Sequence, residues 1–158
     1  MTEAALPAIK KELQNLDATA LAELCMQLTK FKKDNKEYLS YLLFDAHDKE
    51  ATIISIKQKI DAQFSEVNTH QLYFVKKTLR KILTGISKYA KYLGNKQYEA
   101  QLLIYFCNKV KQLNLPLHKN PVLENLYNNQ VKKATKLVAT LHEDLQYDYQ
   151  QELQQLSN

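Results

Sequence analysis

The chain has 158 residues, of which 45% are hydrophobic and 25% are charged, and its formal net charge is +5. This length suits one domain with a real core, and the composition is ordinary for a soluble globular protein. Only two Gly and three Pro are present, although tight turns and sheets depend on these residues. The sequence therefore predicts an all-α fold with few connections, and it excludes a Gly-rich phosphate-binding loop.

The beginning of the chain, MTEAALPAIKKELQNL, lacks the basic segment and apolar run of a signal peptide. No apolar stretch approaches the roughly 20 residues that a membrane-spanning helix needs. Cys25 and Cys107 each lie among apolar residues at helical spacing, so we expect both to be reduced and buried. These features predict a cytoplasmic protein with no membrane partner and no cofactor.

The first half of the chain predicts four helices. Pro7 suits the first turn of a short helix. Three acidic residues suit the N-caps of the helices that follow, namely Asp17, Asp34 and Asp48. The helix after Asp34 is almost uniformly apolar over residues 38–44, so we expect it to be buried on most sides. The helix after Asp48 has an apolar stripe that marks its core side, formed by Ile53, Ile56, Ile60 and Phe64.

The second half begins with a helix from about residues 68–70 to Leu93, which Gly94 and Asn95 end. The next helix spans residues 96–113. Its centre, LLIYFC, is apolar in every direction, which places it in the middle of the fold. After the loop NLPLHKNP, an apolar stripe continues from Pro121 onward and fits one long helix or two abutting ones.

The predicted elements amount to about six to seven helices in a single all-helical domain over residues 1–158. We allow for a frayed tail over about residues 150–158. The segments CMQLTKF and CNKVKQL share a rhythm of small and apolar residues, which favours an irregular α–α superhelix of HEAT-like helix pairs. A compact helical bundle is the alternative architecture.

The stretch KKTLRKILTGISKYAKYLGNK, residues 76–96, contains seven Lys or Arg and no acidic residue. Residues 76–119 carry 10 basic side chains and 1 acidic one, a net charge of +9, whereas the segments before and after each carry −2. At about 100° per residue, five cations share one side of this helix, opposite its apolar side: Lys77, Arg80, Lys81, Lys88 and Lys91. This side either binds the phosphate backbone of a nucleic acid, or is solvated or paired with carboxylates of neighbouring helices.

Two tracts combine acidic residues with histidine. FDAHDKE contains Asp45, His47, Asp48 and Glu50, and LHEDLQYDY contains His142, Glu143, Asp144 and Asp148. Neither has the ligand spacing of a zinc hydrolase, so a metal-dependent enzyme is only a distant alternative. Cysteines on apolar faces also disfavour thiolate chemistry. The sequence therefore predicts no enzymatic activity and indicates no catalytic or metal-binding residue.

The chain has ten Tyr and no Trp. Most of these tyrosines lie on apolar stripes, where packing at the edge of the core is the simplest interpretation. Tyr147 and Tyr149 lie near the chain end with little left to pack against, and Tyr is enriched at protein interfaces. These two residues are therefore the candidates for contact with a protein partner.

Four segments together resemble a family of small uncharacterised all-helical bacterial proteins with no assigned activity: LTKFKKDNKEYLSYLLFDAHDKE, KKTLRKIL, LLIYFCNKV and LHEDLQYDY. The resemblance spans most of the chain. It implies a bacterial, cytoplasmic protein with one helical domain, and it brings no site residues. We therefore expect a non-enzymatic helical interaction module that binds a protein partner, with nucleic-acid backbone binding through residues 76–93 as the alternative. The oligomeric state does not follow from the sequence.

Overall fold

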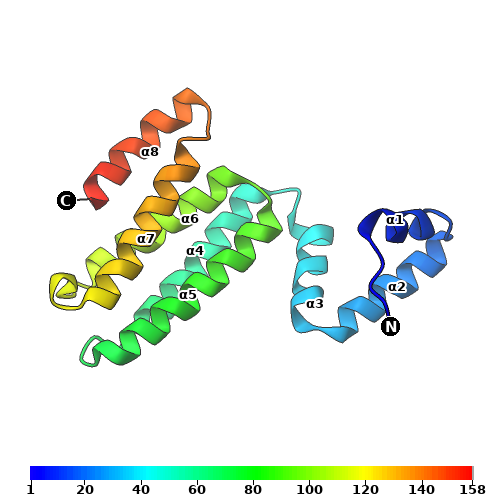
Figure 1. Ribbon diagram of the computed structural model, residues 1–158, viewed down its shortest axis with the longest axis horizontal. Coiled ribbons are helices and arrows are strands. Elements are labelled where there is room, and N and C mark those ends of the chain that lie inside the picture. Colours follow the sequence, from blue (N-terminus) through cyan, green and yellow to red (C-terminus); the bar gives the residue numbers. More distant parts are fainter. Residues whose placement is uncertain (158) are drawn as a thin grey trace. The chain divides into compact units, whose positions relative to one another are not determined.

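The computed structural model describes residues 1–157, which form eight α-helices and no β-strand (Figure 1). The all-α class is confirmed, and the number of helices is slightly higher than expected. The described residues separate into two units, residues 1–45 and the residues from 46 onward, and the single domain stays a prediction. Within residues 1–157, none of the helices combines the length and the apolar character that crossing a bilayer requires.

The N-terminal unit consists of α1 (Leu6–Gln14), α2 (Ala18–Phe31) and α3 (Lys33–Ser40), followed by a π-helical turn, η1 (Tyr41–Asp45). Asp17 caps α2 as predicted, because its carboxylate accepts a hydrogen bond of 2.8 Å from the Ala20 N–H. The prediction for Asp34 is wrong, since Lys32 is the N-cap of α3. Asp34 lies in the first turn of α3, where a negative side chain still favours the helix dipole.

The N-terminal unit has almost no core. Among residues 1–45, Tyr41 is the one buried hydrophobic side chain. Of the large side chains expected to be buried on most sides, Tyr41 is buried and Leu39 is half-buried, but four are 39–68% exposed: Tyr38, Leu42, Leu43 and Phe44. Cys25, also expected to be buried, is exposed. Both predictions are wrong, because an apolar face is buried only where another element covers it.

The C-terminal unit consists of five helices, with a short 3-10 turn, η2 (Leu117–Lys119), before the fourth. They are α4 (Lys49–Ser65), α5 (Leu72–Leu93), α6 (Lys96–Gln112), α7 (Pro121–Val138) and α8 (Glu143–Leu156). Asp48 caps α4 as predicted, by accepting a hydrogen bond of 3.0 Å from the Ala51 N–H. Gly94 ends α5 with a φ of 59°, a left-handed conformation that glycine adopts without steric cost.

The helix α6 forms the centre of the C-terminal unit, where it packs against α4, α5, α7 and α8 (Figure 1). Its buried side chains fill the core: Ala100, Leu102, Leu103, Ile104, Phe106, Cys107 and Val110. The prediction from LLIYFC is confirmed, because a helix that is apolar in every direction needs neighbours on every side. The predicted stripe of α4 is also buried.

The stretch after Pro121 forms two helices, which separate at residues 139–142. His142 caps the second of them, since its Nδ1 accepts a hydrogen bond of 3.3 Å from the Asp144 N–H. Residues 150–156 continue α8, and Leu153 and Leu156 are buried, so they do not form a frayed tail. Residue 158, the last of that predicted tail, lies outside the described residues. The choice between a HEAT-like superhelix and a compact bundle stays a prediction.

Candidate functional site

The helix α5 exposes cations on the side opposite its buried residues. The basic face of α5 is formed by four exposed residues: Lys77, Arg80, Lys81 and Lys91. The buried side is apolar and consists of Val75, Leu79, Ile82, Ile86, Ala90 and Leu93. At a rise of 1.5 Å per residue, the basic face is about 21 Å long.

Among residues 1–157, the cations of the basic face of α5 have no acidic partner. No carboxylate of residues 1–157 lies within ion-pair distance of any of the four. Ion pairs occur elsewhere in the unit, for example between Lys133 and Glu99 at 2.8 Å. Like charges three or four residues apart on a helix repel one another. The face therefore carries a positive potential that a polyanion would neutralise.

The fifth predicted cation, Lys88, is half-buried and differs from the other four. Its Nζ lies 5.2 Å from the centroid of the Tyr89 ring, and the Nζ of Lys59 lies 5.3 Å from the same centroid. Both distances suit cation–π interactions. Lys59 is exposed and belongs to α4, so it adds a cation that the sequence analysis misses. Nothing in the chain indicates that α4 lies beside α5.

Two aromatic residues at the beginning of α5 are also missed by the sequence analysis. Tyr73 and Phe74 are 68% and 48% exposed, and their rings stand edge to face with centroids 5.4 Å apart. At about 100° per residue, Tyr73 lies on the same side of the helix as Lys91, and Phe74 lies near Lys81. Surfaces that bind single-stranded nucleic acids combine such rings, which stack on bases, with cations that hold phosphates. The dipeptide Tyr-Phe one turn before Lys77 is the feature of the sequence from which these two rings could have been noticed.

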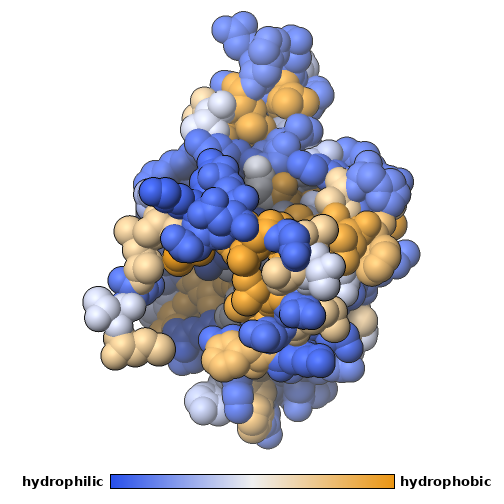
Figure 2. All heavy atoms as spheres, turned by 90° about the vertical axis from the view of Figure 1, so that its right-hand side faces the viewer, coloured by the Kyte–Doolittle hydropathy of each residue, from blue (hydrophilic) through white to orange (hydrophobic). Residues whose placement is uncertain are grey.

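The N-terminal unit exposes a large group of apolar side chains. Twelve apolar side chains of residues 1–45 are each at least 37% exposed, and we refer to them together as the N-terminal apolar face: Leu6, Ile9, Leu13, Leu16, Leu24, Met26, Leu28, Phe31, Tyr38, Leu42, Leu43 and Phe44. They do not all point in one direction, because Met26 lies about 200° from Leu24 and from Leu28 around α2. Part of this face borders an open groove of about 340 Å³ between α1 and α2. Figure 2 shows apolar patches separated by hydrophilic side chains on the side that faces right in Figure 1. Nothing in the sequence pattern distinguishes this face from a buried one.

The two tyrosines predicted to contact a partner differ in their exposure. Tyr147 is 66% exposed, as a contact residue requires. Tyr149 is only 9% exposed, and its hydroxyl accepts a hydrogen bond of 3.3 Å from the Gln97 Nε2 of α6. Residues two apart on a helix point about 200° apart, so these two cannot share a face. Tyr149 is therefore a packing residue, and only Tyr147 remains accessible.

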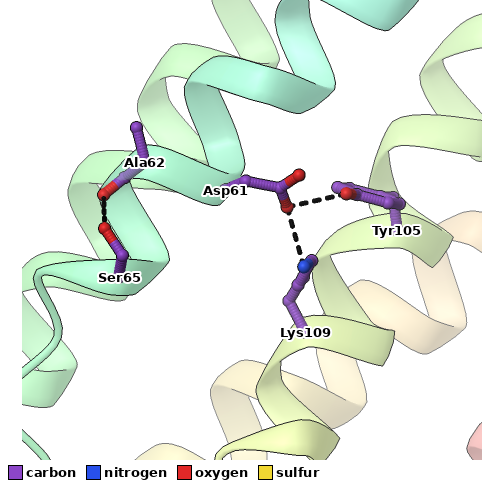
Figure 3. A network of polar contacts seen from close by, with 5 residues as sticks. All are labelled: Asp61, Ala62, Ser65, Tyr105 and Lys109. Atoms are coloured by element: carbon purple, nitrogen blue, oxygen red, sulfur yellow. Dashed lines mark hydrogen bonds and ion pairs between the residues drawn. The ribbon is translucent and has the colours of Figure 1, made fainter.

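A polar network joins α4 to α6 (Figure 3). The carboxylate of Asp61 accepts a hydrogen bond of 2.6 Å from the Tyr105 hydroxyl and pairs with the Lys109 Nζ at 2.8 Å. The hydrogen bond from Lys109, followed in size by the one from Tyr105, lowers the pKa of the Asp61 carboxyl group. The hydrogen bond to Asp61 in turn raises the pKa of the Lys109 ammonium group. Burial, followed by the bond to Asp61, raises the pKa of Tyr105. These three side chains are one another's hydrogen-bond and ion-pair partners, so the network connects α4 to α6.

The histidine and acidic tracts do not converge. Among residues 1–157, no group of three or more His, Cys, Asp or Glu side chains is arranged to hold a metal ion. Within the two tracts, Asp48 and His142 serve as N-caps. Burial raises the pKa of the Cys107 thiol to about 12, so this thiol is not ionised near neutral pH.

No protein-family model matches the chain, and neither a curated protein nor a solved structure matches it. The resemblance to a family of small all-helical bacterial proteins therefore stays a prediction. The basic face of α5 and the N-terminal apolar face are the two surfaces from which a function can be argued.

Proposed function

We propose that the protein is a non-enzymatic helical interaction module that binds a protein partner through the N-terminal apolar face. The observation that carries this proposal is the exposure of twelve large apolar side chains in a unit that buries only Tyr41 among its hydrophobic residues. Monomeric proteins rarely keep a large apolar patch open to water, and such patches are typical of interaction sites. A partner that covers this face gains roughly 25 cal/mol for each Å² of apolar surface removed from water.

The short helices of the N-terminal unit support the same proposal. The helices α1 and α3 have 9 and 8 residues, and helices shorter than about 12–15 residues are marginally stable in water on their own. Most helical stability in proteins comes from packing of an apolar side. A partner that packs on this unit therefore also stabilises its helices.

Photo-cross-linking tests the proposal at two matched positions. Phe31 and Tyr73 are 77% and 68% exposed, and only Phe31 belongs to the N-terminal apolar face. We expect Phe31→benzoylphenylalanine to cross-link to a second polypeptide when living cells that express the full chain are irradiated. Tyr73→benzoylphenylalanine should give no such product. Absence of any interchain polypeptide cross-link from position 31 would contradict the proposal.

Binding of nucleic-acid backbone through the basic face of α5 is the second candidate function. It is favoured by the four cations that have no carboxylate partner. Tyr73 and Phe74 favour a single strand as the ligand, because the bases of a duplex are already stacked and paired, whereas free bases stack on exposed rings.

Fluorescence anisotropy with labelled single- and double-stranded DNA and RNA at low salt tests this second function. We expect single strands to bind more tightly than duplexes. Since stacking on one aromatic ring contributes about 1–3 kcal/mol, replacing Tyr73 and Phe74 by Ala should weaken single-strand binding by roughly tenfold or more. Duplex binding should change little. Absence of binding at low salt would leave the basic face of α5 as a solvated surface.

A further inference from the structure

We infer that the N-terminal apolar face is a dimerisation surface, on which α2 of one copy packs antiparallel to α2 of a second copy. The inference rests on the proposed function, because it identifies the protein partner as the same chain. Four features of residues 1–45 point to a second copy: the apolar spacing of α2, its charge distribution, the nearly neutral net charge of the unit and the area of exposed apolar surface.

The apolar residues of α2 form one stripe. Leu21, Leu24, Leu28 and Phe31 follow each other at intervals of three, four and three residues, the spacing at which two helices pack along a coiled-coil seam. Leu24, Leu28 and Phe31 are 37%, 61% and 77% exposed. The stripe is therefore open to solvent along most of α2.

The charges of α2 are separated along its axis. Asp17, the N-cap of α2, and Glu23 lie in its first half. Lys30 lies in its last turn and Lys32 is its C-cap, and all four side chains are exposed. When two copies pack antiparallel, the acidic beginning of each helix lies beside the basic end of the other. A two-fold axis produces this favourable contact twice. Parallel packing would instead bring like charges together.

The net charge of the N-terminal unit also suits self-association. Residues 1–45 contain six Lys and seven Asp or Glu, so the unit carries a net charge of −1. Two such units do not repel each other appreciably. A strongly acidic or basic partner, in contrast, gains little electrostatic attraction from a nearly neutral surface.

The exposed apolar area is large enough for a stable dimer. If a fully exposed large side chain presents roughly 200 Å², the exposed fractions of the twelve residues amount to on the order of 1,000 Å². A standard protein interface buries about 800 Å² on each partner. Summed over all twelve residues, the exposed apolar surface of residues 1–45 is therefore as large as one side of a standard interface.

The position of Cys25 makes the geometry testable. Cys25 is exposed and lies at the middle of α2, one residue after Leu24 of the stripe. In an antiparallel pair of aligned helices, the middle of each helix lies at the two-fold axis. The two Cys25 thiols then lie close together beside the seam, within reach of a short bismaleimide.

The experiment combines light scattering and cross-linking on the full chain through the micromolar concentration range. We expect the mass of two chains and a bismaleimide-linked dimer, which Cys25→Ser abolishes. Leu28→Asp should give a monomer with no cross-link. Ile54→Asp is the matched control, because Ile54 is 58% exposed but belongs to α4, and this variant should remain a dimer.

Other outcomes overturn the inference in distinguishable ways. A monomer whose Cys25 reacts freely with a monofunctional maleimide would show that the face is open to a different protein, so the proposed function would stand without self-association. A monomer whose Cys25 is protected would show that the chain covers this face itself, and both proposals would fall. A dimer that persists in Leu28→Asp would place the contact on another surface.

Discussion

Removal of charge from the basic face of α5 should change the salt dependence of nucleic-acid binding. For a single strand, the slope of log K against log[salt] is about −0.7 for each phosphate that the protein neutralises. The face provides four exposed cations with no carboxylate partner, so four phosphate contacts give a slope of about −2.8. When Lys77, Arg80 and Lys81 are replaced by Ala, three of the four cations are removed, and the slope should become less negative by about 2.1.

Anisotropy titrations of a labelled single strand at several salt concentrations measure both slopes. The matched control replaces Lys119, Lys132 and Lys136 by Ala, which removes the same charge from exposed positions elsewhere in the C-terminal unit. Its slope should stay near that of the unchanged protein. If both triple variants reduced the slope equally, net charge rather than the basic face of α5 would control binding. A slope near zero for the unchanged protein would refute phosphate contacts altogether.

The packing of the C-terminal unit gives three further predictions. Phe106 is fully buried, whereas Phe74 is 48% exposed. In urea denaturation, Phe106→Ala should therefore lower the free energy of unfolding by about 3–5 kcal/mol, and Phe74→Ala should lower it by about 0.5 kcal/mol or less. Equal losses would contradict this difference in burial. Because its hydrogen bonds hold the pKa of Asp61 below the ordinary 3.8, this carboxylate stabilises the fold above that pH, and the stabilisation is lost as the pH falls through the lowered pKa. Asp61→Asn should therefore lower the melting temperature more at about pH 7 than at about pH 3. The difference should correspond to less than about 1 kcal/mol, because the carboxylate is partly solvated. An equal effect at both pH values would contradict a stabilising role of the ionised Asp61. Since burial raises the pKa of Cys107 to about 12, maleimide near neutral pH should label it only after unfolding, and rapid labelling of the folded protein would contradict its burial.

Several local signals in the sequence predicted the structure correctly, although the N-cap predicted at Asp34 is wrong. Asp17 and Asp48 cap the helices that follow them, because donor and acceptor lie three residues apart and both are visible in the same short segment. The segment LLIYFC is central because its apolar residues leave no side of the helix suited to water. For such features, the information needed lies within one helix.

The same reasoning fails where the outcome depends on a second element. Residues 38–44 are as apolar as LLIYFC, yet most of their large side chains are exposed, because hydrophobicity indicates that a surface needs cover and not what covers it. Lys59 could not be assigned to the surface near α5 for the same reason. Tyr149 is buried because one side of α8 faces α6, a contact that separates it from Tyr147 despite their proximity in the chain.

Because residues 1–45 lack a core, the local stability of their helices depends on whether another surface is packed on them. Amide protons in α6 are protected by the packing of a whole unit, so their exchange rate reports its cooperative unfolding. The amide protons of α1–α3 lack such protection, so their exchange should slow only when another surface packs on these helices. If the partner is a second copy, as we infer, binding stabilises these helices by mass action, and the resistance of residues 1–45 to proteases should rise with protein concentration. The abundance of the protein in the cell would then set how long its N-terminal segment stays intact.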